Sequence, residues 1–300
     1  MIERRIVLFG GTGFIGGHLA ACLARHGWSV RVASRSGHLP VAAGAGARVE
    51  AVAADIRDER QVRAAVAGAE AVVNLVGIGR ERGQGFAAVH VEGAARVARL
   101  AAAAGAASLL HVSALGIAAD APSAADRTKA GGEDAVRAGF PAATLLRPSL
   151  VYGPGDHFFA RFATVARVSP VLPVIGGGLT RFQPLHVDDA TLTFRLLLER
   201  PDTAGTTLAL VGPETFTFRQ LLERMLDVMG LRRSIVPVPF PLAGALAAAA
   251  GWLPVTPLTR EEVRLLRTDK VAGGLPTPAM LGIGARPLAE GLPTTLGRIA

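Results

Sequence analysis

A glycine-rich turn near the N-terminus limits the fold of this chain more than any other feature. Glycines stand at positions 10, 13 and 16 within the run Gly10-Gly11-Thr12-Gly13-Phe14-Ile15-Gly16. A short apolar segment, residues 5–9, precedes the turn, and a helical pattern of apolar residues follows it. Glycines in such a turn let the backbone approach a phosphate, and the helix N-terminus supplies free N–H groups and a positive dipole. The sequence therefore predicts a site for the pyrophosphate of a dinucleotide between a strand and a helix.

The rest of the first half alternates short apolar runs with amphipathic patterns. We expect strands at residues 5–9, 29–33, 49–53, 71–76, 109–113 and 143–147, and helices at 13–26, 59–67, 86–104 and 124–138. Strands that alternate with helices favour βαβ units and a parallel sheet. The predicted fold class is α/β, a Rossmann-type doubly wound parallel sheet, with the dinucleotide-binding domain at residues 1–150.

Beyond residue 150 the pattern becomes irregular, because prolines and a run of three glycines at 176–178 interrupt it. Such segments form loops and short elements, so we expect a smaller substrate or partner lobe at residues 151–185 and 212–300. The region near 186–211 is expected to rejoin the main sheet, with a helix at 188–199 capped by Asp188 or Asp189 and a strand at 207–211. An amphipathic helix is expected at 217–229. The apolar stretch 240–253 is expected to be a core helix of the lobe, and the alternative is an exposed contact patch.

The residues after the second and third strands bear on which dinucleotide binds. Rossmann proteins that prefer NAD commonly place a carboxylate at the end of the second strand for the ribose 2′-hydroxyl. This chain has no acid there, and Arg35 suits a 2′-phosphate, unless it is simply a solvated loop arginine. We therefore expect NADP(H), with NAD(H) as the alternative. Asp55 could accept from the adenine amino group, with the backbone of Ile56 alongside, or it could cap the next helix, a role equally open to Asp58.

Charge and cysteine content argue against several classes of function. The net charge is +8, but the arginines that supply it are dispersed, so nucleic-acid binding is not expected. Cys22 is the single cysteine, which excludes an intrachain disulfide and a thiolate metal site; we expect it in the core. His186 lies beside Asp188 and Asp189 without a suitably spaced third ligand, so no metal is expected. No signal-like segment opens the chain and no apolar stretch is long enough to span a bilayer, which predicts a cytoplasmic protein.

Several of these motifs together resemble one superfamily. They resemble the extended or atypical short-chain dehydrogenase/reductases, near the nucleotide-sugar epimerases. The motifs that carry the likeness are the glycine turn, Asp55, the run Asn74-Leu75-Val76-Gly77 and the run Arg147-Pro148-Ser149-Leu150-Val151-Tyr152-Gly153-Pro154. The likeness covers residues 5–190. It implies that the end of the fourth strand lies along the cofactor and that the segment after Pro148 packs beside the nicotinamide. The predicted cofactor-binding residues are Gly10, Thr12, Gly13, Phe14, Ile15, Gly16, Arg35, Asp55, Ile56, Leu75, Val76, Gly77, Ser113, Lys129, Pro148 and Val151.

The chain departs from this superfamily at the proton donor. Active members carry a tyrosine that transfers the proton, a lysine four residues later that lowers its pKa and holds the ribose, and a serine that orients the substrate oxygen. Ser113 and Lys129 are present as remnants of this set, but Ala125 stands at the tyrosine position. The single tyrosine, Tyr152, is followed four residues later by Asp156, so no displaced pair exists. We expect Tyr152 to be a packing residue, with contact to the nicotinamide as a minor alternative.

Further segments carry a narrower resemblance. They are residues 111–116, 158–162, 171–178, 180–184 and 258–263, with Asp269-Lys270. They are similar to the family of the Rossmann-type accessory subunit of respiratory complex I and its bacterial relatives, whose mitochondrial members hold NADPH tightly and serve structure more than turnover. The resemblance implies an NADP(H)-binding protein of structural or assembly type. Its partner would be a membrane-bound respiratory assembly, which the protein would meet peripherally at the inner face of the membrane.

The alternative function is enzymatic. The chain would then be an NAD(P)-dependent oxidoreductase or a nucleotide-sugar epimerase or dehydratase with a non-standard proton donor. Arg161, Arg167 and Arg181 fall in the lobe that faces the expected cleft. In a sugar-nucleotide enzyme these arginines would hold a diphosphate, in a subunit they would face a partner, and otherwise they are solvated surface residues. The sequence alone favours the structural or assembly function over the enzymatic one.

Overall fold

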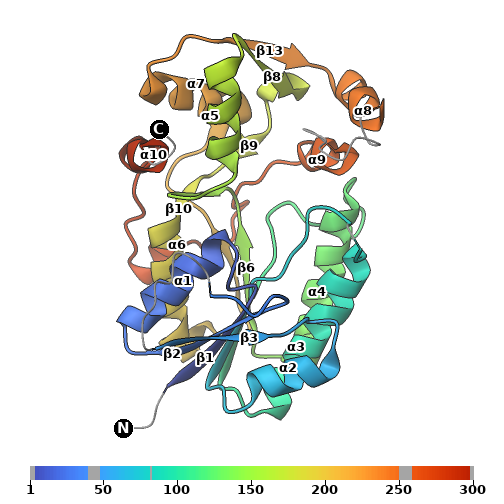
Figure 1. Ribbon diagram of the computed structural model, residues 1–300, viewed down its shortest axis with the longest axis vertical. Coiled ribbons are helices and arrows are strands. Elements are labelled where there is room, and N and C mark those ends of the chain that lie inside the picture. Colours follow the sequence, from blue (N-terminus) through green and yellow to red (C-terminus); the bar gives the residue numbers. More distant parts are fainter. Residues whose placement is uncertain (1–3, 40–47, 82, 250–258, 298–300) are drawn as a thin grey trace.

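A parallel sheet of seven strands forms the larger part of the computed structural model, which describes residues 4–39, 48–81, 83–249 and 259–297 (Figure 1). The strand order is β11-β6-β5-β4-β1-β2-β3. The strands are β1 (Arg5–Phe9), β2 (Ser29–Ser34), β3 (Val49–Ala53), β4 (Ala71–Asn74), β5 (Ser108–Val112), β6 (Thr144–Pro148) and β11 (Thr207–Leu210). The chain winds outward from β1 in both directions, so β1 and β4 flank the switch point. In open α/β sheets, ligands bind in the crevice at the carboxyl ends of the strands at this point.

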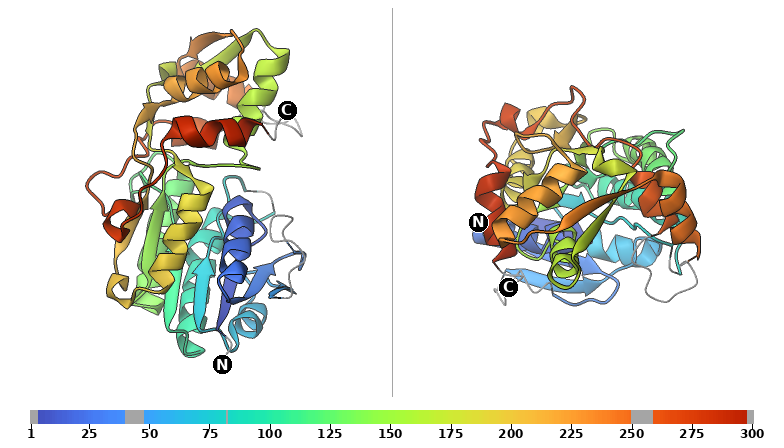
Figure 2. Two further views of the ribbon diagram at one scale, coloured as in Figure 1. Left: turned by 90° about the vertical axis from the view of Figure 1, so that its left-hand side faces the viewer. Right: turned by 90° about the horizontal axis from the view of Figure 1, so that it is seen from above.

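Helices cover both faces of the sheet, which explains why the central strands are almost continuously apolar (Figure 2). On one face, α1 (Phe14–Arg25) and α6 (Val187–Leu198) pack together, and Leu19 and Phe194 are buried against Leu8. On the other face lie α2 (Glu59–Val66), α3 (Ala94–Ala103) and α4 (Ala124–Gly139). A π-helical turn, η2 (Ala88–Gly93), leads into α3. This is the doubly wound α/β architecture that the alternating pattern predicts.

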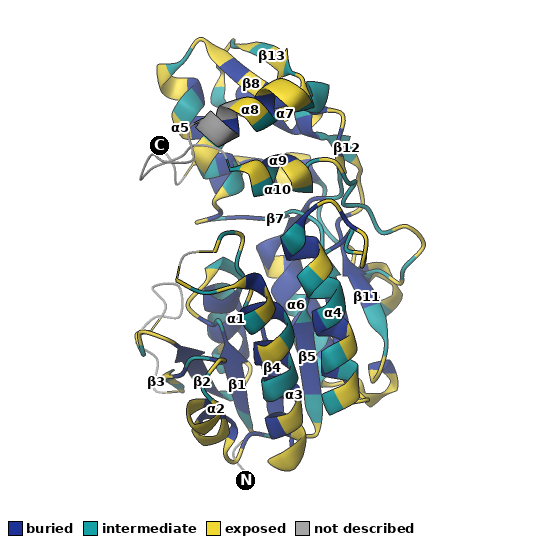
Figure 3. Cartoon of the chain, turned by 90° about the vertical axis from the view of Figure 1, so that its right-hand side faces the viewer, coloured by how far each residue is buried: buried dark blue, intermediate teal, exposed yellow. Residues whose placement is uncertain are grey.

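A smaller lobe lies above the carboxyl ends of the strands (Figures 1 and 3). Its helices are α5 (Phe158–Val168), α7 (Phe218–Met229), α8 (Phe240–Ala249), α9 (Arg260–Leu265) and α10 (Leu288–Leu296). Its strands β8 (Val171–Ile175) and β13 (Ser234–Val238) pair in parallel. The core of the lobe packs α5, α7 and α10 together through Phe159, Leu222, Met225 and Leu292.

Short ladders and turns connect the lobe to the sheet. The strands β7 (Val151–Tyr152) and β10 (Leu185–His186) pair in parallel, while β9 (Arg181–Phe182) and β12 (Phe216–Thr217) pair antiparallel. The part of the chain that the structure describes has 3-10 turns at η3 (Gly176–Gly178), η4 (Pro201–Thr203) and η5 (Pro278–Leu281). Because α6 and β11 return to the sheet between lobe segments, the chain crosses between the two parts several times.

Several expectations about these elements are confirmed. Thr207–Leu210 pairs with β6 at the edge of the main sheet, as predicted for this region. The helix expected at 217–229 begins after Thr217, whose side chain forms a capping box with Gln220. Cys22 is buried, as expected. The stretch 240–253 forms α8 as far as residue 249, with Ala243 and Ala247 buried and Leu242 exposed; residues 250–253 lie outside the described part of the chain.

Other expectations need correction. The helix at 188–199 is not capped by Asp188 or Asp189: His186 fills this position, and its Nδ1 accepts a hydrogen bond from the N–H of Asp188 at 3.2 Å. The strand expected at 71–76 ends at Asn74, because the side-chain oxygen of Asn74 accepts from the N–H of Val76 and turns the chain. The single helix expected at 86–104 includes the π-helical turn η2.

Within the described residues, none of the helices combines the length and the apolar character that crossing a membrane would require.

Candidate functional site

The glycine turn lies between β1 and α1, where backbone must come very close to backbone. Gly10 has a φ of 76°, and a Cβ atom placed there would lie 3.1 Å from the carbonyl carbon of Leu75. A Cβ atom on Gly16 would lie 2.6 Å from the carbonyl oxygen of Gly10. Gly13, at the N-cap of α1, offers no side-chain cap, so the first N–H groups of the helix stay available to an anion. These features fit the pyrophosphate of a dinucleotide, with Thr12 exposed and Phe14 and Ile15 half-buried at the same turn.

The residues expected at the adenosine end lie beside the carboxyl ends of β2 and β3. Arg35 is exposed, and its guanidinium donates to the side-chain oxygen of Gln84 at 3.3 Å. The side chain of Asp55 is held by Arg57, with N–O distances of 2.6 to 3.1 Å. The hydrogen bonds from Arg57 hold the pKa of Asp55 below its usual range. Ile56 is buried in the core beneath them. Arg57 is a second cation at this end of the site that the sequence analysis did not single out.

A buried network fixes the loop after β4 against α4. The N–H of Ile78 donates to Nε2 of His90 at 3.0 Å, so the ring proton belongs on Nδ1, which donates to Oγ1 of Thr128 at 2.9 Å. Burial, with Lys129 and His111 nearby, lowers the pKa of His90 to about 4, which keeps the ring neutral near pH 7. The network sets Gly77, in the loop that also holds Leu75 and Val76, beside the next residue of α4, Lys129.

The remnants of the catalytic set lie at the carboxyl end of β5 and on α4. Oγ of Ser113 is buried, and no hydrogen-bond partner for it exists among the described residues. Lys129 extends over Gly77, where its Cε lies 3.9 Å from the position of a Cβ atom, and burial lowers its pKa. Ala125 is buried one helical turn earlier, and its N–H donates to a carboxylate oxygen of Glu261 at 2.8 Å. A cofactor ribose beside Lys129 and a substrate oxygen beside Ser113 fit this arrangement.

Tyr152 lies in the packed interior between the sheet and the lobe. Its side chain is fully buried, with its ring edge-on to Phe159 and His186. Burial, which disfavours the phenolate, raises its pKa. Its neighbour Val151 is half-buried in β7. Tyr152 does not line the cavity described next, and its surroundings are those of a packing residue.

A largely apolar cavity of about 680 Å³ lies between the sheet and the lobe. Its floor is formed at the carboxyl ends of β5 and β6 by Ala114, Pro148 and Ser149. Its walls come from α5, β8, α7, α8 and α9, and they are mostly aromatic and aliphatic. The aromatic wall residues are Phe158, Phe162, Phe182 and Phe218. Cavities of 300 to 1,000 Å³ with apolar walls and a few polar groups are typical of small-molecule sites.

Five charged side chains interrupt the apolar lining, and they lie near the floor or at α9. Nζ of Lys270 lies 3.1 Å from a carboxylate oxygen of Asp126, and both side chains are almost fully buried. Asp126 and Lys129 are three residues apart, on the same face of α4. At the lobe side, Arg161 pairs with Glu262 at 3.4 Å. Sequence reasoning missed Asp126 and Lys270 as site residues, because no local motif links positions so far apart.

The lobe arginines do not gather around a free anion site. Arg161 pairs with Glu262, and Arg181 pairs with Asp269 at 2.8 Å. Arg167 is exposed near the end of α5 and does not line the cavity. Each of the two paired arginines already has a carboxylate, so neither is left over to neutralise a sugar diphosphate.

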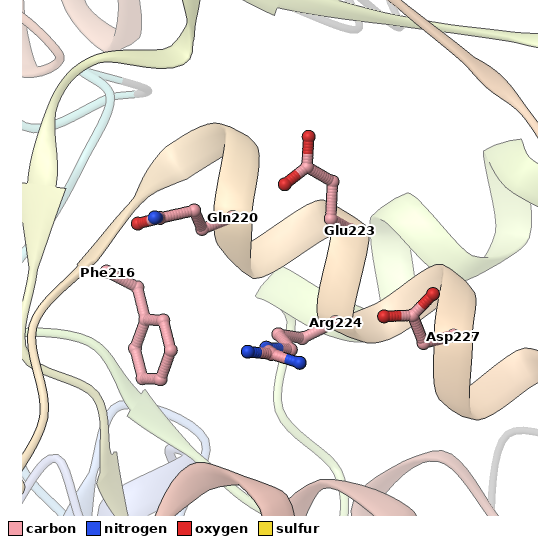
Figure 4. A pocket seen from close by; sticks show the side chains of 5 residues that line it. All are labelled: Phe216, Gln220, Glu223, Arg224 and Asp227. Atoms are coloured by element: carbon pink, nitrogen blue, oxygen red, sulfur yellow. The ribbon is translucent and has the colours of Figure 1, made fainter.

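A second hollow, of about 300 Å³, lies along α7 (Figure 4). Only α7 and the strand before it contribute to it, through Phe216, Gln220, Glu223, Arg224 and Asp227. It is open, polar and formed by exposed residues, and none of the cofactor-site residues lines it. We therefore assign the site to the interdomain cavity. Among the described residues, no group of His, Cys, Asp and Glu side chains is arranged to hold a metal ion.

The chain is similar to proteins of known sequence and structure. The sequence model of a family described as "NAD dependent epimerase/dehydratase family" matches residues 6–211. A "Ceramide reductase" of Caulobacter vibrioides is 34% identical over 98% of this chain and 90% of that protein. The mitochondrial "NADH dehydrogenase (ubiquinone) 1 alpha subcomplex subunit 9" of Arabidopsis thaliana is 35% identical over 82% of this chain, which spans 63% of that protein.

Solved structures give the same answer about the fold. A dTDP-glucose 4,6-dehydratase from Streptomyces venezuelae, solved with NAD bound, superposes with a TM-score of 0.74 and 22% identity, and the match covers 98% of this chain and 96% of that one. The family model confirms the predicted superfamily, and the solved structure confirms the Rossmann-type fold.

Proposed function

This chain belongs to the NAD dependent epimerase/dehydratase family. From that premise we propose that it is an NADP(H)-dependent reductase of apolar carbonyl compounds. It would work without the tyrosine that active members of the family use. The observation that carries the proposal is the cavity of about 680 Å³, whose apolar walls end at Lys129, Asp126 and Lys270. A nicotinamide dinucleotide supplies hydride to a carbonyl carbon. In this proposal Lys129 holds the ribose and Ser113 holds the substrate oxygen.

The chemistry of the walls supports the substrate class. A nucleotide sugar carries two phosphates, which need unpaired cations, and the lobe arginines at hand are paired with Glu262 and Asp269. Four phenylalanines and the aliphatic residues of α8 and β8 instead suit an alkyl chain. The chain is also 34% identical to a protein named ceramide reductase. We infer a long-chain ketone as the substrate class.

Arg35 supports the choice of NADP(H) over NAD(H). Its guanidinium is exposed at the end of β2, and Ser34 and Ser36 flank it. Arg57 lies on the same side of Asp55 and adds positive charge where a 2′-phosphate would bind. The predicted role of Asp55 as an adenine contact remains part of this proposal.

A second function has its own support, and it is the one that the sequence alone favours. Ala125 cannot donate a proton, and the chain is 35% identical to a protein named as a subunit of NADH dehydrogenase. In this case NADP(H) would stabilise the fold by binding the native state alone. The protein would serve a membrane-bound respiratory assembly at the inner face of the membrane, and the cavity would hold a bound lipid without turnover.

The experiment that tests the proposal starts from protein stripped of cofactor. NADPH and NADH are titrated by fluorescence. Reduction of 2-dodecanone by the reduced dinucleotide and conversion of UDP-glucose in the presence of the oxidised dinucleotide are then followed. We expect NADPH to bind more tightly than NADH, and we expect turnover with the ketone alone. Arg35→Ala should weaken NADPH binding by about 10- to 100-fold, the loss typical of one charge-assisted hydrogen bond, and should leave NADH binding unchanged.

The matched control is Arg60→Ala, an exposed arginine on α2 near the same edge of the sheet. It should bind both dinucleotides like the wild type. Equal affinity of the wild type for NADPH and NADH would remove Arg35 from its role. Tight NADPH binding without reduction of any long-chain ketone would favour the subunit function, and turnover with UDP-glucose would contradict the assigned substrate class.

A further inference from the structure

Lys270 reaches the cavity floor from a tail segment that three contacts hold in place. Its N–H donates to the carbonyl oxygen of Arg181 at 2.8 Å, and its own carbonyl oxygen accepts from Oγ of Ser149 at 2.6 Å. Two residues on, the N–H of Ala272 donates to the side chain of Gln183 at 2.6 Å. The backbone of Lys270 is therefore fixed against the loop after β6, and its ammonium group is presented at a defined place.

The ammonium group lies beside the start of α4, next to the position that the tyrosine would occupy. Nζ of Lys270 lies 3.1 Å from Oδ2 of Asp126, which is the residue after Ala125, and 3.1 Å from the position of a Cβ atom on Gly116. Gly116 follows Ser113 by three residues. Lys270 thus lies between the segment after β5 and the face of α4 that carries Lys129. These are the two elements that hold the rest of the catalytic set.

Two buried oxygens on the elements that flank Lys270 have incomplete hydrogen bonding. Oδ1 of Asp126 and Oγ of Ser113 find no partner among the described residues. A buried polar atom without a partner is costly, so such atoms commonly mark a place for a ligand or water. Asp126 lines the cavity floor, and Ser113 directly precedes Ala114, which lines the floor as well. A ligand oxygen that binds at this floor would accept from Lys270.

We propose that Lys270, oriented by Asp126, is the catalytic group that binds and protonates the carbonyl oxygen of the substrate in place of the absent tyrosine. The inference rests on the proposed reductase function and adds the proton donor to it. Asp126 is a positioning residue, because it acts through Lys270. An ammonium group is suited to this role, since it donates hydrogen bonds to a developing oxyanion and carries a transferable proton.

The reduction moves one hydride and one proton to the substrate. The carbonyl carbon of the substrate accepts a hydride from the reduced dinucleotide, and the π electron pair of the C=O bond moves onto oxygen. That oxygen takes a proton from Nζ of Lys270, so an N–H bond breaks and an O–H bond forms. The substrate is reduced by two electrons to a secondary alcohol, and the dinucleotide is oxidised by two electrons. Lys270, now a neutral amine beside Asp126, regains its proton from water.

A purely structural ion pair makes different predictions. It would tie the tail to α4 and affect stability, but it would not touch the substrate. We therefore compare three variants. Lys270→Ala removes the proton donor. The double variant Asp126→Asn with Lys270→Met removes both charges, so no buried carboxylate is left unpaired. Asp269→Asn is the control. Asp269 precedes Lys270 and lies outside the cavity, where it holds Arg181 through a partly exposed ion pair and a hydrogen bond from the N–H of Arg181.

The first readout is reduction of 2-dodecanone by NADPH. We expect Lys270→Ala and the double variant to lose about 100-fold or more in turnover, the usual contribution of a general acid. We expect Asp269→Asn to stay within about threefold of the wild type, since an exposed pair contributes little. Ethylamine added to Lys270→Ala should restore part of the rate in proportion to its concentration. A structural role predicts no such rescue.

The second readout does not depend on turnover. The chain has two lysines, Lys129 and Lys270, so protein labelled with ¹³C-lysine gives two Cε signals, and the Lys270→Ala spectrum assigns them. With NADP⁺ bound, 2-dodecanone should shift the Lys270 signal. Bound ketone with an unshifted Lys270 signal, or a Lys270→Ala rate within threefold of the wild type, overturns the assignment while the reductase function stands. If the wild type neither binds nor reduces the ketone, the proposed function fails and the assignment fails with it.

Discussion

At the scale of single residues, we propose that Ala125 replaces a proton-donating side chain while the groups around it are kept. Ala125 donates its backbone N–H to Glu261, while Lys129 remains buried over Gly77 and Ser113 keeps an unpaired hydroxyl. Burial disfavours the charged form of Lys129 and so lowers the pKa of its ammonium group. Buried titratable groups of this kind concentrate at functional sites. This is why we favour chemistry over a site that has merely decayed.

His90 gives a residue-scale prediction about pH. Its pKa is about 4 in the folded protein, against an ordinary value of 6.5, because burial disfavours the charged ring. Between these values the unfolded chain binds a proton that the folded protein does not, so stability is lost as the pH falls from 6.5 toward 4. The difference amounts to roughly 3 kcal/mol at most. His90→Gln, which can still accept from Ile78 and donate to Thr128, should remove this part of the loss.

Urea unfolding measured in steps from pH 7 to pH 4 tests the prediction. The free energy of unfolding of the wild type should fall more steeply over this interval than that of the variant. His26→Gln is a suitable control, since His26 is exposed at the end of α1. Parallel curves for the wild type and His90→Gln would show that His90 is not the titrating group.

At the scale of elements, the short helix α9 connects the lobe to the cofactor-binding part. Glu261 accepts hydrogen bonds from Oγ of Ser123 at 2.7 Å and from the N–H of Ala125 at 2.8 Å, so it caps the N-terminus of α4 from outside that helix. The next residue, Glu262, pairs with Arg80 at 3.0 Å and Arg161 at 3.4 Å. One turn of helix thereby holds α4, the loop after β4 and α5 together.

Replacing Glu261 tests the contribution of this cap. Glu261→Ala leaves the N–H of Ala125 without its acceptor, and we expect a loss of about 1–2 kcal/mol in the free energy of unfolding, as for other helix caps. Glu223→Ala is the matched control, because its pairing with Arg219 on α7 is long, at 3.9 Å, and mostly exposed. That variant should differ from the wild type by less than about 0.5 kcal/mol. Equal losses in the two variants would show that the cap contributes nothing specific.

How much of this could be predicted from sequence depends on the range of the interactions. The glycine turn, the strands around it and the amphipathic helix α7 follow from local periodicity and spacing, and the structure confirms them. The Asp126–Lys270 pair joins residues 144 positions apart, and no local pattern signals it. The cap of α6 was misplaced for a related reason. Histidine is not a usual N-cap residue, and the acids after it were the conventional candidates.

At the scale of the whole molecule, the sheet supplies the cofactor site and the lobe supplies most of the cavity wall. The two parts meet where α9 lies against α4, and the cavity lies along this contact. Any ligand that fills the cavity touches both parts at once. We therefore expect cofactor and apolar ligand to bind with positive coupling, since each orders surfaces that the other uses.

Glu262 tests whether α9 transmits cofactor binding from the sheet to the lobe. Burial alone would raise the pKa of Glu262, but hydrogen bonds from Thr259 and Arg80 outweigh it and hold the pKa below its usual range. Glu262→Ala should therefore remove the ion pairs with Arg80 and Arg161 and lower the free energy of unfolding by about 1–3 kcal/mol. Hydrogen exchange should quicken in α9 and in the loop at 77–81, which carries Arg80, and remain unchanged in the central strands β1 and β4. NADPH should still bind, because the glycine turn is untouched, but it should no longer slow exchange in α9.

The exposed pair of Arg200 with Asp202 offers the control, and Asp202→Asn should leave exchange in α9 as in the wild type. If NADPH protects α9 equally in the wild type and in Glu262→Ala, the two parts communicate by another route than this helix.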